Sequence, residues 1–162
     1  MTVDLAELER RVACQETAED ARTSVSRYAA ACDTHDLGQI GTIFATDGVV
    51  SVRGDSWVGL DEVRRFYREA WAASPGPSRH FITNVAMSDL QPSRVDVTAY
   101  LLYVTATADG SSQIGWGSYR DRYVRHGDRL VVQSKHIVLD LVVDVRDGWA
   151  EAMHRVAAMV SG

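Results

Sequence analysis

Hydrophobic residues recur at helical spacing in the first part of the chain. Within residues 4–34, one apolar stripe occupies positions 5–12 and a later stripe occupies positions 25–32. This period of about 3.6 residues predicts a long amphipathic helix. The polar stretch at residues 16–22 indicates either a kink or a break between two helical segments.

Two shorter helices are predicted further along the chain. Residues 36–45 place their apolar side chains on one side, and Asp36 stands where an N-cap is expected. Residues 60–73 have a clear apolar face that includes Phe66 and Trp71. The Ser-Pro-Gly-Pro sequence after them ends this helix, because proline cannot continue one.

The pattern then changes to alternation of apolar and polar residues, which is typical of strands with one buried face. The strands predicted from it are residues 49–53, 56–58, 79–90, 94–108, 112–125 and 130–144. Turns are expected at Arg53-Gly54-Asp55, Asp109-Gly110 and His126-Gly127-Asp128. Residues 145–160 return to helical spacing and predict a C-terminal helix packed on the body or on a partner.

This order of elements predicts an α+β fold rather than alternating βαβ units. We expect a cone-shaped, curved antiparallel sheet wrapped around the N-terminal helices, with an apolar cavity inside that suits a small molecule. Residues 1–144 would form one domain, and residues 145–162 would be a helical extension of that same domain.

Composition narrows the class of partner. The net charge of −5 argues against nucleic acid, which requires a basic surface. No apolar run reaches membrane-spanning length and no signal peptide is apparent, so we expect a cytoplasmic protein with no membrane partner. Cys14 and Cys32 lie on the same predicted helix, too far apart to pair, and are expected to be free thiols.

Two titratable residues carry the candidate chemistry. His80 lies in a predicted strand, and Asp33 lies at the end of the first predicted helix. If they meet in an apolar cavity, the carboxylate fixes the tautomer of the imidazole and raises its pKa, which makes His80 a general base. Alternatively, His80 is a hydrogen-bonded core residue, and Asp33 caps the helix or binds an arginine such as Arg27 or Arg79.

Ordered motifs along the chain resemble the nuclear transport factor 2-like superfamily in its SnoaL-like branch. They are Tyr28-x4-Asp33-x2-Asp36, Ile43-Phe44-x2-Asp47, Gly59-x-Asp61-Glu62-Val63, His80-x3-Asn84, Gly117-x-Tyr119-x-Asp121-x-Tyr123 and a last strand ending near Asp140. The resemblance implies the cone fold described above. It leaves the reaction open, because the superfamily contains isomerases, dehydratases, cyclases, dehydrochlorinases, epoxide hydrolases and proteins without catalysis.

The resemblance also implies roles for individual residues. His80 and Asp33 match the acid-base pair of the enzyme members, and Tyr28 matches a tyrosine of the bile acid dehydratases. Lys135 matches a basic residue on the last strand, where it would polarise a substrate oxygen together with Tyr28. Leu130 departs from the family, which usually has tryptophan there, and we interpret this as a packing change. Lys135, the only lysine, could instead be a surface residue.

Further residues are candidates for substrate binding. Asn84 shares a strand face with His80 by the two-residue period and could orient a substrate. Aromatic side chains could line a pocket, or else belong to the core or a dimer interface. These are Trp57, Phe66, Trp71 and Tyr119. Lys135 and His136 point to opposite strand faces, and the family pattern favours Lys135 in the cavity. His35 and His126 fall in turns and are expected to be solvated.

We therefore expect a cofactor-free lyase or isomerase, such as a dehydratase, double-bond isomerase or cyclase. Its substrate would be a hydrophobic, oxygenated small molecule, and the protein would be a homodimer or larger homo-oligomer. No metal or organic cofactor is expected, since the five histidines and two cysteines lack paired ligand spacing and no glycine-rich phosphate loop follows a strand. The alternatives are a non-catalytic small-molecule binder and an accessory protein like the small subunit of aromatic-ring dioxygenases.

Overall fold

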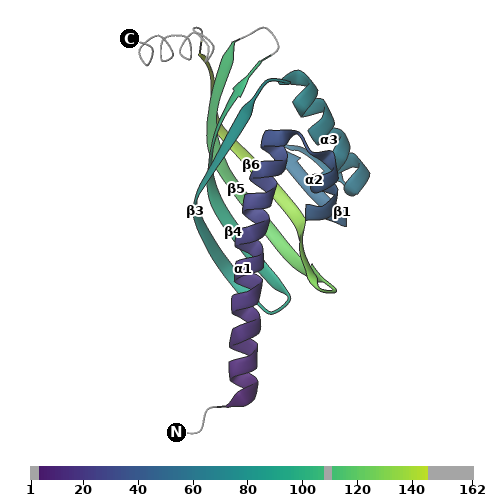
Figure 1. Ribbon diagram of the computed structural model, residues 1–162, viewed down its shortest axis with the longest axis vertical. Coiled ribbons are helices and arrows are strands. Elements are labelled where there is room, and N and C mark those ends of the chain that lie inside the picture. The colour runs from purple at the N-terminus through teal and green to yellow at the C-terminus, as the bar shows by residue number, and fades with distance from the viewer. Residues whose placement is uncertain (1–3, 108–110, 146–162) are drawn as a thin grey trace, which may run out of the picture.

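A computed structural model describes residues 4–107 and 111–145 (Figure 1). The predicted Asp109-Gly110 turn and the predicted C-terminal helix lie outside the described residues. Within them, helices come first and long strands follow, so the expected α+β class is confirmed. None of the described helices is long and apolar enough to cross a membrane.

Helix α1 (Leu5–Thr34) packs along the sheet, mainly on β3, and its N-terminal part extends past the sheet edge (Figure 1). The polar stretch in its middle does not interrupt it. Thr17 and Ala21 in this stretch are buried, and such small side chains let the helix approach the sheet closely. Leu5 and Leu8 are exposed, so this part of the first predicted apolar stripe is not buried within the described part of the chain.

Two short helices follow the expected boundaries closely. Helix α2 (Leu37–Ile43) begins after Asp36, whose carboxylate accepts a hydrogen bond from the Gln39 backbone N–H at 2.9 Å. The predicted N-cap is therefore confirmed. Helix α3 (Leu60–Ala73) covers one end of the sheet and has acidic residues in its first turn, where negative charge suits the helix dipole (Figure 1).

The sheet has six strands in the order β2-β1-β6-β5-β4-β3. They are β1 (Phe44–Val52), β2 (Asp55–Val58), β3 (Ser78–Gln91), β4 (Arg94–Ala106), β5 (Ser112–His126) and β6 (Arg129–Val145). The expected antiparallel sheet needs a correction, because β1 pairs with β6 in parallel. Parallel neighbouring strands need a long connection, and α3 together with the four strands β2, β3, β4 and β5 supplies it here. The curved sheet stays open, with β2 and β3 as its edges.

The two faces of the sheet are different. On β4, Val95, Val97 and Ala99 are buried at alternate positions, as the sequence predicted.

The hairpin between β1 and β2 turns at Arg53 and Gly54, whose φ angles of 54° and 94° are both positive. Two positive φ angles are typical of the type I′ turn that suits a two-residue hairpin.

An apolar row crosses the outer face of the sheet. Strand register aligns Phe81 with Leu102, Leu102 with Trp116 and Trp116 with Leu141. These four side chains come from four neighbouring strands and are between 41% and 52% exposed. A continuous apolar row of this kind on a sheet face is a candidate protein interface.

Candidate functional site

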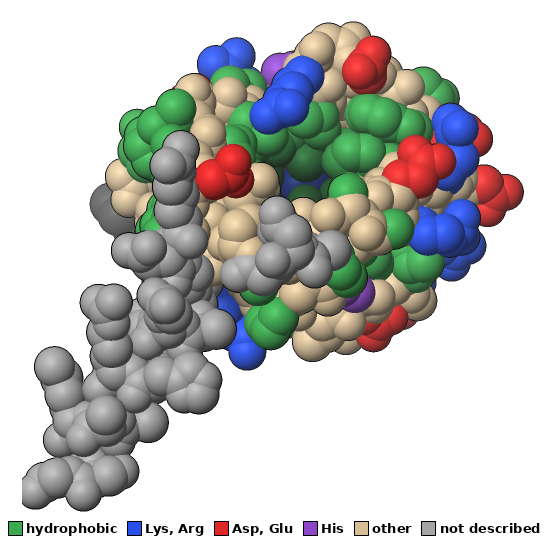
Figure 2. Space-filling model, turned by 90° about the horizontal axis from the view of Figure 1, so that it is seen from above, with side chains coloured by type: hydrophobic (Ala, Val, Ile, Leu, Met, Phe, Trp, Pro, Cys, Tyr) green, Lys and Arg blue, Asp and Glu red, His purple; other side chains and the backbone are tan. Residues whose placement is uncertain are grey.

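A cavity of about 240 Å³ lies between the C-terminal end of α1, helix α3 and the inner face of the sheet. The view from above shows the molecule hollowed on this side, with hydrophobic side chains around the hollow (Figure 2). Phe66 and Trp71 line the cavity from α3, and Leu101, Tyr119 and Ile137 line it from the sheet. The site is therefore mostly apolar, as small-molecule sites usually are.

His80 and Asp33 meet at the wall of this cavity. The Nδ1 atom of His80 lies 2.7 Å from Oδ1 of Asp33, and the His80 backbone N–H donates to the same oxygen at 2.9 Å. The two side chains are 16% and 15% exposed. Because a carboxylate only accepts hydrogen bonds, Nδ1 carries the proton and Nε2 is the basic nitrogen of the ring.

The alternative partners proposed for Asp33 make other contacts. A guanidinium nitrogen of Arg27 donates to the Thr42 hydroxyl at 3.1 Å. A guanidinium nitrogen of Arg79 donates to the Ser78 carbonyl at 2.6 Å. Asp33 also does not cap its own helix, because the C-cap residue of α1 is His35 in the left-handed conformation. The carboxylate is thus directed to the histidine, although 47 positions separate the two residues.

Burial reverses the expected direction of the His80 pKa shift. Desolvation lowers the pKa of His80 below its ordinary value of 6.5 and outweighs the Asp33 carboxylate, which raises it. The sequence-based expectation that Asp33 would raise this pKa is therefore wrong in its net result. A lowered pKa keeps the imidazole neutral near pH 7, which is the form that can accept a proton.

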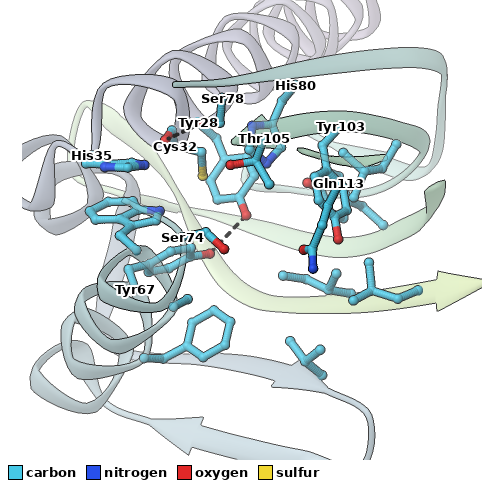
Figure 3. Close-up of a pocket in the computed structure, with 18 residues that line it drawn as sticks. Tyr28, Cys32, His35, Tyr67, Ser74, Ser78, His80, Tyr103, Thr105 and Gln113 are labelled. Atoms are coloured by element: carbon cyan, nitrogen blue, oxygen red, sulfur yellow. Dashed lines mark hydrogen bonds between the residues drawn. The ribbon is translucent and has the colours of Figure 1, made fainter. Parts of the chain in front are cut away.

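Three phenols form the floor of the cavity. Tyr67 donates a hydrogen bond to the hydroxyl of Tyr28 at 3.1 Å, and the Tyr28 and Tyr119 rings meet edge to face at 5.7 Å. The hydroxyl of Tyr28 points toward the middle of the site (Figure 3). Burial raises the pKa of all three phenols well above 10, so they remain protonated hydrogen-bond donors.

Lys135 is buried and His136 is exposed. The expectation that Lys135 contacts substrate oxygen needs a correction, because Lys135 does not line the cavity. Its Nζ lies 2.7 Å from Oδ2 of Asp121, and its side chain is only 2% exposed. The ammonium also lies 4.0 Å from the ring centroid of Tyr28 and 3.7 Å from that of Tyr119.

The predicted binding residues divide into two groups. Phe66, Trp71 and Tyr119 line the cavity. Trp57 does not, and its ring packs on Phe66 with the centroids 4.5 Å apart. Asn84 is exposed and also lies outside the cavity lining, because β3 has a bulge in its pairing with β4 between Thr83 and Ala86. A bulge breaks the two-residue period that placed Asn84 beside His80.

Several lining residues were missed by the sequence reasoning. His35 was expected to be solvated, yet its ring stacks on Trp71 at 5.1 Å and lines the cavity. Tyr103 and Gln113 line the side opposite His35 (Figure 3). The alternation along β4 already placed Tyr103 on the inner face with Leu101, so that signal was present. No pattern indicated His35, because its position depends on how the end of α1 meets α3.

The residues described do not form a metal centre. Across residues 4–107 and 111–145, no group of three or more histidine, cysteine, aspartate and glutamate side chains could hold a metal ion. Cys32 lines the cavity as a free thiol, and burial raises its pKa to about 12. A thiol with such a pKa is a weak nucleophile and a poor metal ligand at neutral pH.

The fold and the cavity define the chain as an α+β cone with an internal, mostly apolar cavity. The sequence model of the SnoaL-like domain family matches residues 15–136, which is about three quarters of the chain. The chain therefore belongs to the SnoaL-like domain family of the nuclear transport factor 2-like superfamily. A search of curated proteins found no match to the sequence.

Solved structures share this fold at low sequence identity. A protein assigned as a scytalone dehydratase from Novosphingobium aromaticivorans is 14% identical, with a TM-score of 0.70 over 82% of this chain and 92% of the other. A hexachlorocyclohexane dehydrochlorinase from Novosphingobium barchaimii is 16% identical, with a TM-score of 0.72 over 83% and 92%. A protein of unknown function from Mycobacterium tuberculosis is 19% identical, with a TM-score of 0.68 over 76% of both chains.

Proposed function

We propose that this protein is a cofactor-independent lyase or isomerase that acts on a hydrophobic, oxygenated small molecule by general acid-base catalysis. The observation that carries this proposal is the 2.7 Å contact between His80 and Asp33 at the wall of an apolar cavity. The dehydratase and the dehydrochlorinase that share the fold both have names that denote eliminations, which supports the same reaction class.

His80 is the general base in this proposal, and Asp33 orients it. For a dehydration, Nε2 takes a proton from the carbon next to a carbonyl, and the electron pair of that C–H bond forms an enolate. The enolate then expels a β-hydroxyl group, which leaves as water with the proton returned by the imidazolium. A positioned base of this kind contributes on the order of 10²–10⁴-fold to the rate.

Tyr28 is the proposed donor to the negatively charged oxygen. Because the Tyr28 hydroxyl accepts its hydrogen bond from Tyr67, its own proton is available to an oxygen of the ligand. A positioned donor in a site that excludes water is worth on the order of 10²–10³-fold. Tyr67 supports this role by orienting the Tyr28 hydroxyl.

The volume of the cavity limits the size of the substrate. A volume of about 240 Å³ lies just below the range of roughly 300–1,000 Å³ that is usual for ligand sites. We therefore propose a substrate with one or two rings rather than a steroid. Phe66 and Trp71 supply flat apolar walls, and Gln113 supplies a polar group on the sheet side of the site.

Proton abstraction can be tested without knowing the natural substrate. Small cyclic ketones that carry a β-hydroxyl group are incubated with the protein in D₂O, and NMR measures deuterium entry next to the carbonyl and loss of water. We expect His80→Gln to slow exchange by about 100-fold or more. His126→Gln is the matched control, because His126 is exposed at the end of β5 and does not line the cavity.

Equal exchange rates for the native protein and for His80→Gln would refute the catalytic proposal. Binding of these ketones without exchange would favour the non-catalytic binder. Co-purification with a large iron-sulfur partner, without exchange, would favour the accessory subunit.

We further propose that the protein is a cytoplasmic homodimer that buries the outer apolar row of Phe81, Leu102, Trp116 and Leu141. Support comes from the exposure of this row on four adjacent strands and from the two free cysteines, which suit a reducing compartment. Sedimentation of the native chain and of Trp116→Glu tests the interface. A dimer in both would place the contact elsewhere.

A further inference from the structure

A second ionic pair lies beneath the cavity floor. Lys135 and Asp121 are register partners on β6 and β5, and their side chains are only 2% and 1% exposed. Tyr119, two residues before Asp121 on the same strand face, lines the cavity, whereas Asp121 does not. The ammonium therefore lies between the cavity floor and the carboxylate.

Stability alone does not explain this pair. Removing two charges from water costs several kcal/mol per ion, and a buried ion pair is often no more stabilising than apolar side chains of the same volume. Val50, Val95 and Val132 in the same core show that apolar packing is available here. A role for the charge itself is the better explanation.

The geometry links the charge to the phenols of the site. The ammonium of Lys135 contacts the ring faces of both Tyr28 and Tyr119, with centroid distances of 4.0 Å and 3.7 Å. A cation against the face of a ring is attracted by the ring quadrupole, which is worth more when the cation is desolvated. One ammonium thus holds two rings in a fixed orientation, and it withdraws electron density from both phenols.

We propose that Lys135 is a positioning residue, which holds Tyr28 and Tyr119 by cation–π contacts and thereby makes the cavity prefer a ligand with a negatively charged oxygen. This inference rests on the proposed function only in taking the cavity as the binding site. Lys135 itself does not touch the ligand, which distinguishes this role from the direct contact implied by the family resemblance.

The positive charge of Lys135 also shifts the pKa of other groups around the cavity. The pKa of His80 is lowered first by burial and also by the Lys135 charge. The Cys32 thiol, whose pKa burial raises, is influenced by Lys135 in the direction that favours its anion. A fixed positive charge that favours thiolate over thiol also favours phenolate or enolate over the neutral ligand.

The test compares two probes of nearly equal shape, 4-nitrophenolate and nitrobenzene, at a pH where the phenol is ionised. The affinity of each is measured by absorbance or calorimetry for the native protein and for Lys135→Met/Asp121→Asn, which removes both charges and keeps the volume. We expect the native protein to prefer the phenolate and the double variant to lose about tenfold of that preference, since hydrogen bonds to charged groups are the stronger ones. Lys135→Arg should retain the preference.

A matched control removes an exposed pair from the same sheet. Arg122 and Asp96 form a cross-strand ion pair between β5 and β4, and Arg122→Met/Asp96→Asn should leave both affinities unchanged. A native protein that binds neither probe, or shows no preference for the phenolate, would overturn the proposal. So would an unchanged preference in the charge-free variant.

The outcome is independent of the lyase proposal. If the double variant loses the phenolate preference but the native protein catalyses no exchange, the role of Lys135 is supported and the lyase proposal is rejected. If the native protein catalyses exchange but the double variant keeps the preference, the lyase proposal is supported and the role of Lys135 is rejected.

Discussion

Two pairs of a basic side chain and a carboxylate lie at the cavity wall and beneath the cavity floor, each with a contact of 2.7 Å, and their environments differ. His80 and Asp33 are 16% and 15% exposed at the cavity wall. Lys135 and Asp121 are 2% and 1% exposed beneath the cavity floor. Distance alone therefore does not distinguish a group that can exchange protons from one that is fixed.

The chemistry of the two bases explains the contrast. An imidazole can lose its charge at modest cost, so burial lowers the pKa of His80 and leaves a neutral base. The Lys135 ammonium instead contacts a carboxylate and two ring faces, which fix its position. The first pair is suited to move a proton, and the second is suited to hold a charge in place.

Replacing only Lys135 in the buried pair should have the largest effect on stability. Lys135→Met leaves the Asp121 carboxylate buried without its partner, and we expect the free energy of unfolding to fall by about 3–5 kcal/mol. Urea denaturation followed by circular dichroism measures the change. Lys135→Met/Asp121→Asn should recover most of it, and failure to recover would mean that Lys135 stabilises the core by packing.

Changing Asp33 in the pair at the cavity wall should affect the reaction rate rather than folding. Asp33→Asn keeps an oxygen near Nδ1 but removes the negative charge that stabilises the imidazolium. We expect proton exchange to slow by about 10²–10⁴-fold with the circular dichroism spectrum unchanged. A variant with native exchange rates would show that Asp33 has only a structural role.

The pH dependence sharpens the comparison further. Because the folded state lowers the pKa of His80 below 6.5, the unfolded chain binds a proton first as the pH falls. This contribution to stability is fully present above pH 6.5 and is lost as the pH falls through the lowered folded value. His80→Gln should flatten that part of the curve of unfolding free energy against pH, whereas identical curves would contradict the lowered pKa.

An exposed pair provides the smallest expected effect. Arg122 and Asp96 also pair across strands, at 2.7 and 2.8 Å, but on the solvent side of the sheet. Solvent and salt screen such a pair, so Arg122→Met/Asp96→Asn should leave the urea midpoint nearly unchanged. A loss as large as that of Lys135→Met would show that burial is not the cause of the difference.

The sequence predicted the elements well because each has a local cause. Helical spacing and the Asp36 cap defined α2, the prolines after Ser74 ended α3, and alternation defined the four long strands. The Arg53-Gly54 turn was likewise readable from residue type. The pairing of His80 with Asp33 came from family resemblance, since no local pattern connects residues 47 positions apart.

Tertiary structure alone decided the rest. The parallel pairing of β1 with β6, the bulge that moves Asn84 out of the cavity and the stacking of His35 on Trp71 all depend on contacts between distant segments. The same is true of electrostatics, because the pKa of His80 depends on how much water the fold removes and not only on its neighbour. Residue type and spacing determine which groups are present, whereas burial determines the charge that each group carries.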